Sequence, residues 1–387
     1  RSRHTRSYSV TGVQTCARSI YGQAWRGFPA DVALCRREDD GRRPAKAALL
    51  AAALAMAALA QDAPKPLPEF EWLAESRIRY ESRTGMNFGR EVDTSTAILR
   101  QRLGMTWRPS EWVKISAMAQ DCRAPLYGRP APASLRDPLD LQEGYAEIHQ
   151  PGGEGVEISA GRRMISYGDA RLIGSPQWAN TTRTWDHARV SWRTPRARID
   201  GLFLSPVDVN LNGFNRPRMD RRLWGVYTTV PALRKGLAGE FYVLRHDQGF
   251  SGVLRTNSFG GRLVGKSASG WGFEAEGVLQ NGEAGVKRHR GAGLFISVSR
   301  RIEVGARPLT VVGEYKRASG TKDPSDPSGS TTFDQLYPAN HDKFGHEDLL
   351  GWRNIQNMRA QAGYGVHKLL TLTLMYDDSW QIGRAHV

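Results

Sequence analysis

The chain has 387 residues, of which 54 are Lys or Arg and 39 are Asp or Glu, so its formal net charge at pH 7 is +15. This charge excludes an acidic disordered chain, and only three Cys exclude a disulfide-stapled mini-protein. Together with 41 Gly and 11 Trp, the negative mean hydropathy favours many short strands over a bundle of long helices.

The longest apolar run covers residues 47–60 and is shorter than the ~20 residues that a membrane-spanning helix needs. Basic residues precede this run, and small residues at its end form a small-x-small cleavage pattern. We therefore predict a secretory signal peptide over residues 42–60. The other interpretation is a buried Ala/Leu helix. The Pro-rich stretch that follows the run argues against this helix.

The two ends of the chain differ in character from the rest. Residues 9–16 and 383–387 resemble translated sequencing-adapter sequence, so we predict that residues 1–41 and 381–387 are not native. The mature protein is then expected to be one domain over residues 61–380. This domain keeps 43 basic and 35 acidic residues, a net charge of +8.

From Trp72 onward, segments of about ten residues alternate between apolar and polar side chains, as in membrane β-barrels. In the first segment, Trp72, Ile78 and Tyr80 share one face while Arg77 and Arg79 share the other. Clear further examples lie at residues 99–107, 113–120, 187–193 and 271–280. We count about sixteen such segments up to Trp380, so the sequence predicts an all-β antiparallel fold.

Alternation alone does not show which face is exposed to water, because the strands of a soluble antiparallel sheet also alternate between apolar and polar residues. Aromatic residues at segment ends, charges of both signs on the polar face and the export signal favour a transmembrane β-barrel with its apolar face toward lipid. The alternative is a secreted sandwich or solenoid. Residues 221–230 cannot be assigned a phase, and residues 369–374 are nearly all apolar or Thr.

Three stretches of the sequence resemble a known family. They are the loop motif Phe333-Asp334-Gln335-Leu336-Tyr337-Pro338 with its continuation to Asn354, Gly161-Arg162-Arg163 with residues 167–174, and residues 119–124. These stretches are similar to motifs of the alginate export family of outer-membrane porins, and the resemblance covers nearly all of residues 70–380.

The resemblance implies an eighteen-stranded monomeric barrel that passes an anionic polysaccharide through a narrow basic constriction. About sixteen strands are then present here, and C-terminal strands are missing. By motif position, Arg77, Arg100, Glu143 and Arg162 match charged pore-lining positions of the family. This chain departs from the family where Gln142 and Met164 replace further arginines.

The alternation places a larger set of cations on the polar face. This set comprises Arg77, Arg79, Arg100, Arg102, Lys114, Arg163, Arg189 and Arg193. Arginine suits a site for uronate carboxylates, because its planar fork binds a carboxylate through two hydrogen bonds and keeps its charge. Nearby Glu75, Glu81 and Glu143 allow a second interpretation, in which the arginines form cross-strand ion pairs that fill the lumen. Both roles remain open at this point.

The sequence thus predicts a monomer in the bacterial outer membrane that passes an anionic saccharide or a small organic anion. Its expected partners are this anion, outer-membrane lipid and periplasmic proteins that deliver polymer, with no nucleic acid. The loop at residues 318–354 is expected to shape or occlude the mouth. We expect no catalysis, cofactor or metal. The alternative function is a secreted carbohydrate-binding protein or hydrolase with Glu274 and Glu276 as its carboxylate pair.

Overall fold

The computed structural model describes residues 4–10, 68–83, 93–127, 130–249, 254–323, 325–326, 329–341, 343–344, 350–367 and 369–383. The predicted signal peptide at residues 42–60 lies outside these ranges. The segments predicted to be non-native, 1–41 and 381–387, are described only at residues 4–10 and 381–383.

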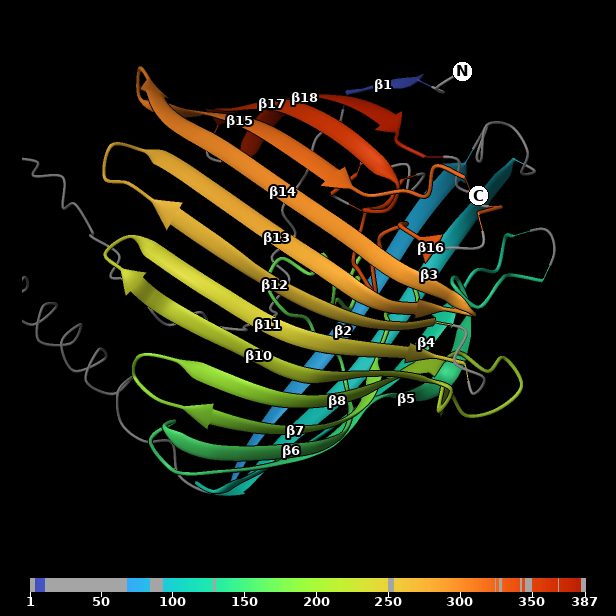
Figure 1. Cartoon of the computed structure of the whole chain (residues 1–387). Coiled ribbons are helices and arrows are strands. Elements are labelled where there is room, and N and C mark those ends of the chain that lie inside the picture. The colour runs from blue at the N-terminus through green and yellow to red at the C-terminus, as the bar shows by residue number, and fades with distance from the viewer. Residues whose placement is uncertain are drawn as a thin grey trace, which may run out of the picture.

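The long strands of the described chain run antiparallel along one strongly curved sheet, and the two-residue strand β16 pairs parallel with β14 (Figure 1). The strands are β1 (His4–Val10), β2 (Glu69–Arg83), β3 (Thr94–Ser110), β4 (Val113–Arg123), β5 (Asp137–His149), β6 (Gly155–Arg163), β7 (Trp185–Arg193), β8 (Arg198–Asp208), β9 (Arg216–Pro217), β10 (Arg221–Arg234), β11 (Leu237–Gln248), β12 (Leu254–Lys266), β13 (Trp271–Ala284), β14 (Lys287–Val304), β15 (Arg307–Ala318), β16 (Gly329–Ser330), β17 (Ile355–His367) and β18 (Leu370–Gln381).

Each long strand from β2 to β18 pairs with the next one along the chain. The pairs β8–β10 and β15–β17 pass over the two-residue strands β9 and β16. Within the described residues, fifteen strands of 9–18 residues thus lie between Glu69 and Gln381. The sequence predicted about sixteen. β1 pairs with the outer edge of β18, and no register joins β2 to β18 or β1 in this part of the chain, so the sheet is curved but not closed.

The two ends of the sheet differ. At one end the strands are joined by tight turns, such as Lys235–Gly236 and residues 305–306. At the other end lie the long connections 124–136, 164–184 and 319–354, on the right of Figure 1. Short turns at one end and long loops at the other are typical of outer-membrane barrels, where the long loops are extracellular. We call these the short-turn end and the long-loop end.

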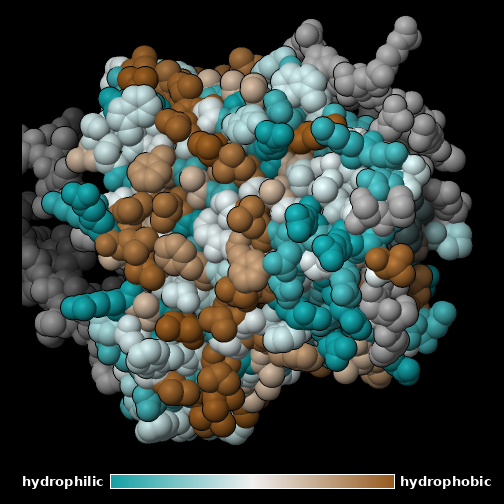
Figure 2. All heavy atoms as spheres, in the orientation of Figure 1, coloured by the Kyte–Doolittle hydropathy of each residue, from teal (hydrophilic) through white to brown (hydrophobic). Residues whose placement is uncertain are grey.

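The two faces of the sheet divide the side chains as the alternation predicts. On the outer face, Trp72 is 69% exposed, Ile78 74% and Leu279 67%. Polar side chains such as Gln120 and Ser191 are buried on the inner face. Figure 2 shows hydrophobic side chains spread over the strands and hydrophilic ones gathered at the long-loop end. The all-β antiparallel fold predicted from the sequence is confirmed.

Two loops fold into the interior, residues 164–184 and residues 331–341. The two loops pair with each other: a parallel bridge joins Ile173 to Tyr337, and the amide of Gly174 donates to the carbonyl of Tyr337 at 2.9 Å. Around this pairing lies a buried apolar cluster that includes Leu223 and Tyr227 of β10. We call the two loops together the plug.

The plug explains why residues 221–230 could not be assigned a phase. Trp224 and Val226 of β10 point outward, while Leu223 and Tyr227 point inward and pack against the plug. Both faces of this strand are therefore apolar. Gly225 lies between them with φ of 149°, and a Cβ at this position would lie 2.1 Å from the carbonyl oxygen of Val243, so only glycine allows this close approach.

We predict that Leu279→Arg destabilises the folded protein in lipid vesicles by about 2–4 kcal/mol, because Leu279 lies near the middle of β13 on the lipid-facing side. The matched control is Val286→Arg in the fully exposed turn after β13, where the expected change is about 0–1 kcal/mol. Urea unfolding followed by tryptophan fluorescence measures both values. Equal effects at the two positions would contradict the assignment of the outer face.

Candidate functional site

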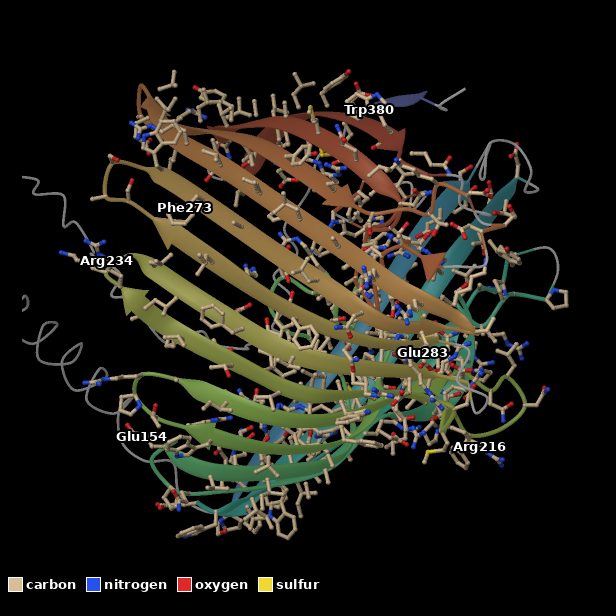
Figure 3. The ribbon with its side chains drawn as sticks, in the orientation of Figure 1. Glu154, Arg216, Arg234, Phe273, Glu283 and Trp380 are labelled. Atoms are coloured by element: carbon tan, nitrogen blue, oxygen red, sulfur yellow. The ribbon has the colours of Figure 1, made fainter. Side chains whose placement is uncertain are left out.

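The polar side chains of the inner face are concentrated toward the long-loop end, where Figure 3 labels Glu283 and Arg216. The ten residues proposed from the sequence fall into two cation-rich clusters and a third group around Arg162.

The first cluster contains Arg77, Arg79, Arg100 and Arg102 with Glu75 and Glu81. Arg77 lies opposite Arg100 in the β2–β3 register, and Glu75 lies opposite Arg102. Arg100 Nε donates to Glu75 Oε1 at 2.8 Å, and an Nη of Arg102 lies 3.2 Å from Glu75 Oε2. Arg79 pairs with Glu81. Four cations therefore lie beside two carboxylates, and three of them form ion pairs with these groups.

The same arginines hold the first loop of the plug. Arg77 donates to the carbonyl oxygens of Gln177 and Ala179, at 2.8 and 3.1 Å, and Arg100 donates to the same two oxygens. Arg79 donates to the carbonyl of Trp178, and its Cζ lies 4.0 Å from the centroid of that ring. Carbonyls of an irregular loop lack strand partners, so these guanidinium groups supply the missing donors.

The second cluster contains Lys114, Arg163, Arg189 and Arg193 with Glu147 and Glu157. An Nη of Arg163 donates to Glu147 Oε2 at 3.1 Å, whereas Arg189 and Arg193 both pair with Glu157. Lys114 Nζ and Arg163 Cζ lie 5.4 and 4.3 Å from the ring centroid of Tyr145. Here, too, four cations lie beside two carboxylates, and Lys114 and Arg163 lie over the negative ring face of Tyr145.

The third group surrounds Arg162, which donates to both carboxylate oxygens of Asp186, at 2.7 and 3.2 Å. Asp140 lies 3.6 Å from the same guanidinium. Gly161, with φ of 122°, precedes this arginine, and a Cβ there would lie 2.3 Å from the carbonyl oxygen of Gly144. Glycine thus permits the close β5–β6 approach that positions Arg162. Glu143 accepts the amide of Met164 at 2.9 Å, where the first plug loop begins.

Of the two positions that depart from the family pattern, Gln142 contacts the plug and Met164 is its first residue. Gln142 is 4% exposed and donates to the carbonyl of Thr182 at 3.1 Å. Gln177 donates to the sulfur of Met164 at 3.4 Å. Neutral side chains therefore hold the loop at these positions without adding charge to the interior.

The family model described as alginate export matches residues 72–383, which is well over half of the chain. The chain belongs to the alginate export family. Membership of this family, together with the porin fold, places the protein in the bacterial outer membrane. No curated protein sequence matches the chain. Within the described residues, no helix is long and apolar enough to cross a bilayer.

Solved structures of outer-membrane porins have the same fold as this alginate export family member. A BenF-like porin from Pseudomonas fluorescens Pf-5 has a TM-score of 0.55 at 11% identity, covering 80% of this chain and 83% of that chain. OccK8 (OprE) of Pseudomonas aeruginosa has a TM-score of 0.55 at 11% identity, covering 80% and 84%. OccK2 (OpdF) of the same organism has a TM-score of 0.51 at 9% identity, covering 80% and 97%.

Sequence reasoning missed the role of Arg171, which anchors the plug of this family member to the opposite wall. Its side chain is buried, and one Nη lies 2.7 Å from Glu274 Oε1 and 2.9 Å from Glu276 Oε2. Its Cζ lies 3.4 Å from the ring centroid of Phe295. Arg171 belongs to a stretch that carries the family resemblance, but its partners are more than 100 residues away, so no local pattern connects them.

These contacts also occupy the carboxylate pair considered for a hydrolase. Glu274 Oε1 accepts from Arg262 Nε at 2.8 Å as well as from Arg171, and Glu276 Oε1 accepts from the hydroxyl of Tyr242 at 2.8 Å. A glycosidase pair needs one carboxyl group to give a proton to the leaving group and the other to face the sugar. Both groups here instead bind protein side chains.

The two plug loops are further held together by buried charges. Arg183 donates to the carbonyl oxygens of Gly174 and Tyr337, at 2.9 and 2.8 Å. Burial lowers the pKa of Arg183 to about 10, so this group keeps its charge at neutral pH. In the second loop, burial opposes ionisation of Asp334, but hydrogen bonds from His246 and Thr256 prevail and lower its pKa to about 2.

We predict that Arg171→Gln loosens the plug, because the buried Glu276 loses its cation while Glu274 keeps Arg262. Removal of one partner of a buried pair costs about 3 kcal/mol, so hydrogen-exchange protection of amides in residues 164–184 should fall roughly a hundredfold. The control is Arg255→Gln, whose exposed pair with Glu283 is separated by 4.0 Å and should leave protection unchanged. Unchanged protection in Arg171→Gln would contradict the anchoring role.

Proposed function

We propose that this porin passes anionic saccharides of the alginate type, or small organic anions, passively through an arginine-lined lumen and without catalysis. The observation that carries the proposal is the local excess of positive charge in the two clusters, each of which has four cations beside two carboxylates. A polymer with one carboxylate per sugar loses hydration in a narrow pore, and fixed cations compensate for this loss.

The ion pairs support passage rather than tight binding. A bare arginine ladder would hold a polyanion at every step, whereas arginines that already share carboxylates attract it weakly enough for release. Conduction requires binding sites that are favourable to enter and easy to leave. The neutral Gln142 and Met164 lower the charge further, which supports a range of anions broader than alginate alone.

The proposal includes the surroundings of the pore. The protein would act as a monomer in outer-membrane lipid, and periplasmic proteins would deliver polymer to the short-turn end. The plug lies inside the sheet near the long-loop end and supports a role of this loop region in shaping the mouth.

Single-channel recording in planar bilayers tests the proposal. The reversal potential in a KCl gradient should indicate anion preference, and added polyuronate should reduce the conductance. A cation preference together with a conductance that polyuronate leaves unchanged would refute the proposed function.

Lys114 offers the sharpest test of the lining, because its ammonium contacts a ring and forms no ion pair within the described residues. Arg77 and Arg100 suit the purpose less well, since they also hold plug carbonyls. We expect Lys114→Glu to lower the ratio of anion to cation permeability several-fold, because one unit charge at 4 Å contributes ~1 kcal/mol even in water.

The matched control is Lys235→Glu in the exposed turn between β10 and β11 at the short-turn end. The reversal potential of this variant should remain that of the unchanged protein. Equal shifts in the two variants would show that general surface charge, and not the second cluster, sets the selectivity.

A further inference from the structure

A polar cavity lies at the long-loop end, between the plug and the wall, near the position that Glu283 marks in Figure 3. Its volume is about 590 Å³, within the range of about 300–1,000 Å³ that is usual for small-molecule sites. The residues that line it come from the ends of β10 to β14, from plug residues 332–338 and from Arg353. None of the ten residues proposed from the sequence lines this cavity.

The cavity gathers positive charge that protein carboxylates do not neutralise. Arg221 and Arg353 both line it, and within the described residues neither guanidinium forms an ion pair or a side-chain hydrogen bond. The arginines of the two clusters, by contrast, share carboxylates or hold loop carbonyls. Arg221 and Arg353 are therefore free to bind an anion from outside.

Asp334, the one acidic group of the lining, already accepts hydrogen bonds from the protein. Asp334 Oδ2 accepts from His246 Nδ1 at 2.8 Å and from the hydroxyl of Thr256 at 2.6 Å, and its Oδ1 accepts from the amide of Leu336 at 3.1 Å. These bonds fix the plug segment against β11 and β12. Asp334 thus shapes the cavity, and the two arginines outweigh its single negative charge in the lining.

His289 adds an unsatisfied polar group to the lining. Its side chain is 2% exposed, and neither ring nitrogen has a hydrogen-bond partner. Buried polar side chains are nearly always hydrogen-bonded, because an unmade bond costs about 1–3 kcal/mol. A ligand hydroxyl in the cavity would be a suitable partner once the imidazole turns toward it.

The family motif at residues 351–354 positions one of the two arginines. Trp352 is fully buried, its Nε1 donates to the carbonyl of Arg317 at 3.0 Å, and its ring lies 5.2 Å from that of Phe333. Asn354, on the other side, is buried, and its backbone amide donates to the carbonyl of Ser319 at 3.3 Å. These two anchors hold Arg353 at the rim of the cavity.

We propose that this cavity binds a single uronic acid unit, with the sugar carboxylate between Arg221 and Arg353 and a ring hydroxyl on His289. The planar fork of arginine matches a carboxylate, and a hydroxyl satisfies the imidazole. The choice of a sugar acid as the ligand rests on the proposed function. The observation of two arginines without ion pairs does not depend on it. The unit is either a free monosaccharide or the end of a polymer.

Isothermal titration calorimetry of the full chain in detergent micelles tests the proposal. Sodium D-glucuronate should bind saturably at one site per chain, and D-glucose, which lacks the carboxylate, should not bind. Polyuronate that competes with glucuronate would assign the site to polymer ends, and polyuronate without effect would assign it to the free sugar acid. Absence of saturable glucuronate binding, or inorganic phosphate binding as tightly, would overturn the proposal.

Variants connect the binding to the named residues. The double variant Arg221→Gln with Arg353→Gln should weaken glucuronate binding at least tenfold, and His289→Leu should weaken it several-fold. Arg222→Gln is the matched control, because Arg222 is the exposed neighbour of Arg221 on β10 and does not line the cavity. A shift on unboiled gels confirms folding of each variant, and unchanged affinity in the folded double variant would overturn the proposal.

The two proposals fail separately. Loss of glucuronate binding in a channel that keeps its anion preference would refute only the cavity site. Glucuronate binding by a channel without anion preference would refute only the proposed passage.

Discussion

The structure depends on one constraint: a backbone in lipid must satisfy its amides and carbonyls within the protein, because hydrocarbon offers no water. The long strands from β2 to β18 meet it by pairing each with the next. The plug loops leave this ladder and carry irregular backbone into the interior. Their carbonyls are satisfied by guanidinium groups, from Arg77 and Arg100 on the wall and from Arg183 within the plug.

Arginine therefore has a structural role in this protein, whatever its role in transport. Its five donors serve carboxylates and loop carbonyls at once, as in Arg100, which binds Glu75 and two carbonyls. The charge left after this pairing is an excess of cations in both clusters. The two interpretations of the arginines, ion-pair filling and anion attraction, are thus compatible. The positive charge that the ion pairs do not neutralise is the charge proposed to attract anions.

The plug also divides the interior into regions of different character. Toward β2–β7 the wall carries the paired cations of the two clusters. Toward β8–β14 the wall is mixed: the rings of Tyr227 and Tyr242 stack 5.2 Å apart in the apolar cluster, and their hydroxyls donate to the buried Glu240 and Glu276. At the far edge of this cluster lies the cavity with Arg221 and Arg353. The two plug loops thereby separate the proposed passage from the proposed binding site.

The sequence by itself determined the fold class and the two faces of β2 to β4, because a period of two is a local property that survives any tertiary arrangement. The alternation also predicted a set of cations for the polar face. Only the tertiary structure decided their partners. In β10, Leu223 faces the plug while Val226 faces lipid, and both surroundings select apolar side chains, so no pattern distinguishes them. The contacts of Arg171 with Glu276 and of Asp334 with His246 join residues about 90–105 positions apart, and only the curvature of the sheet brings them together.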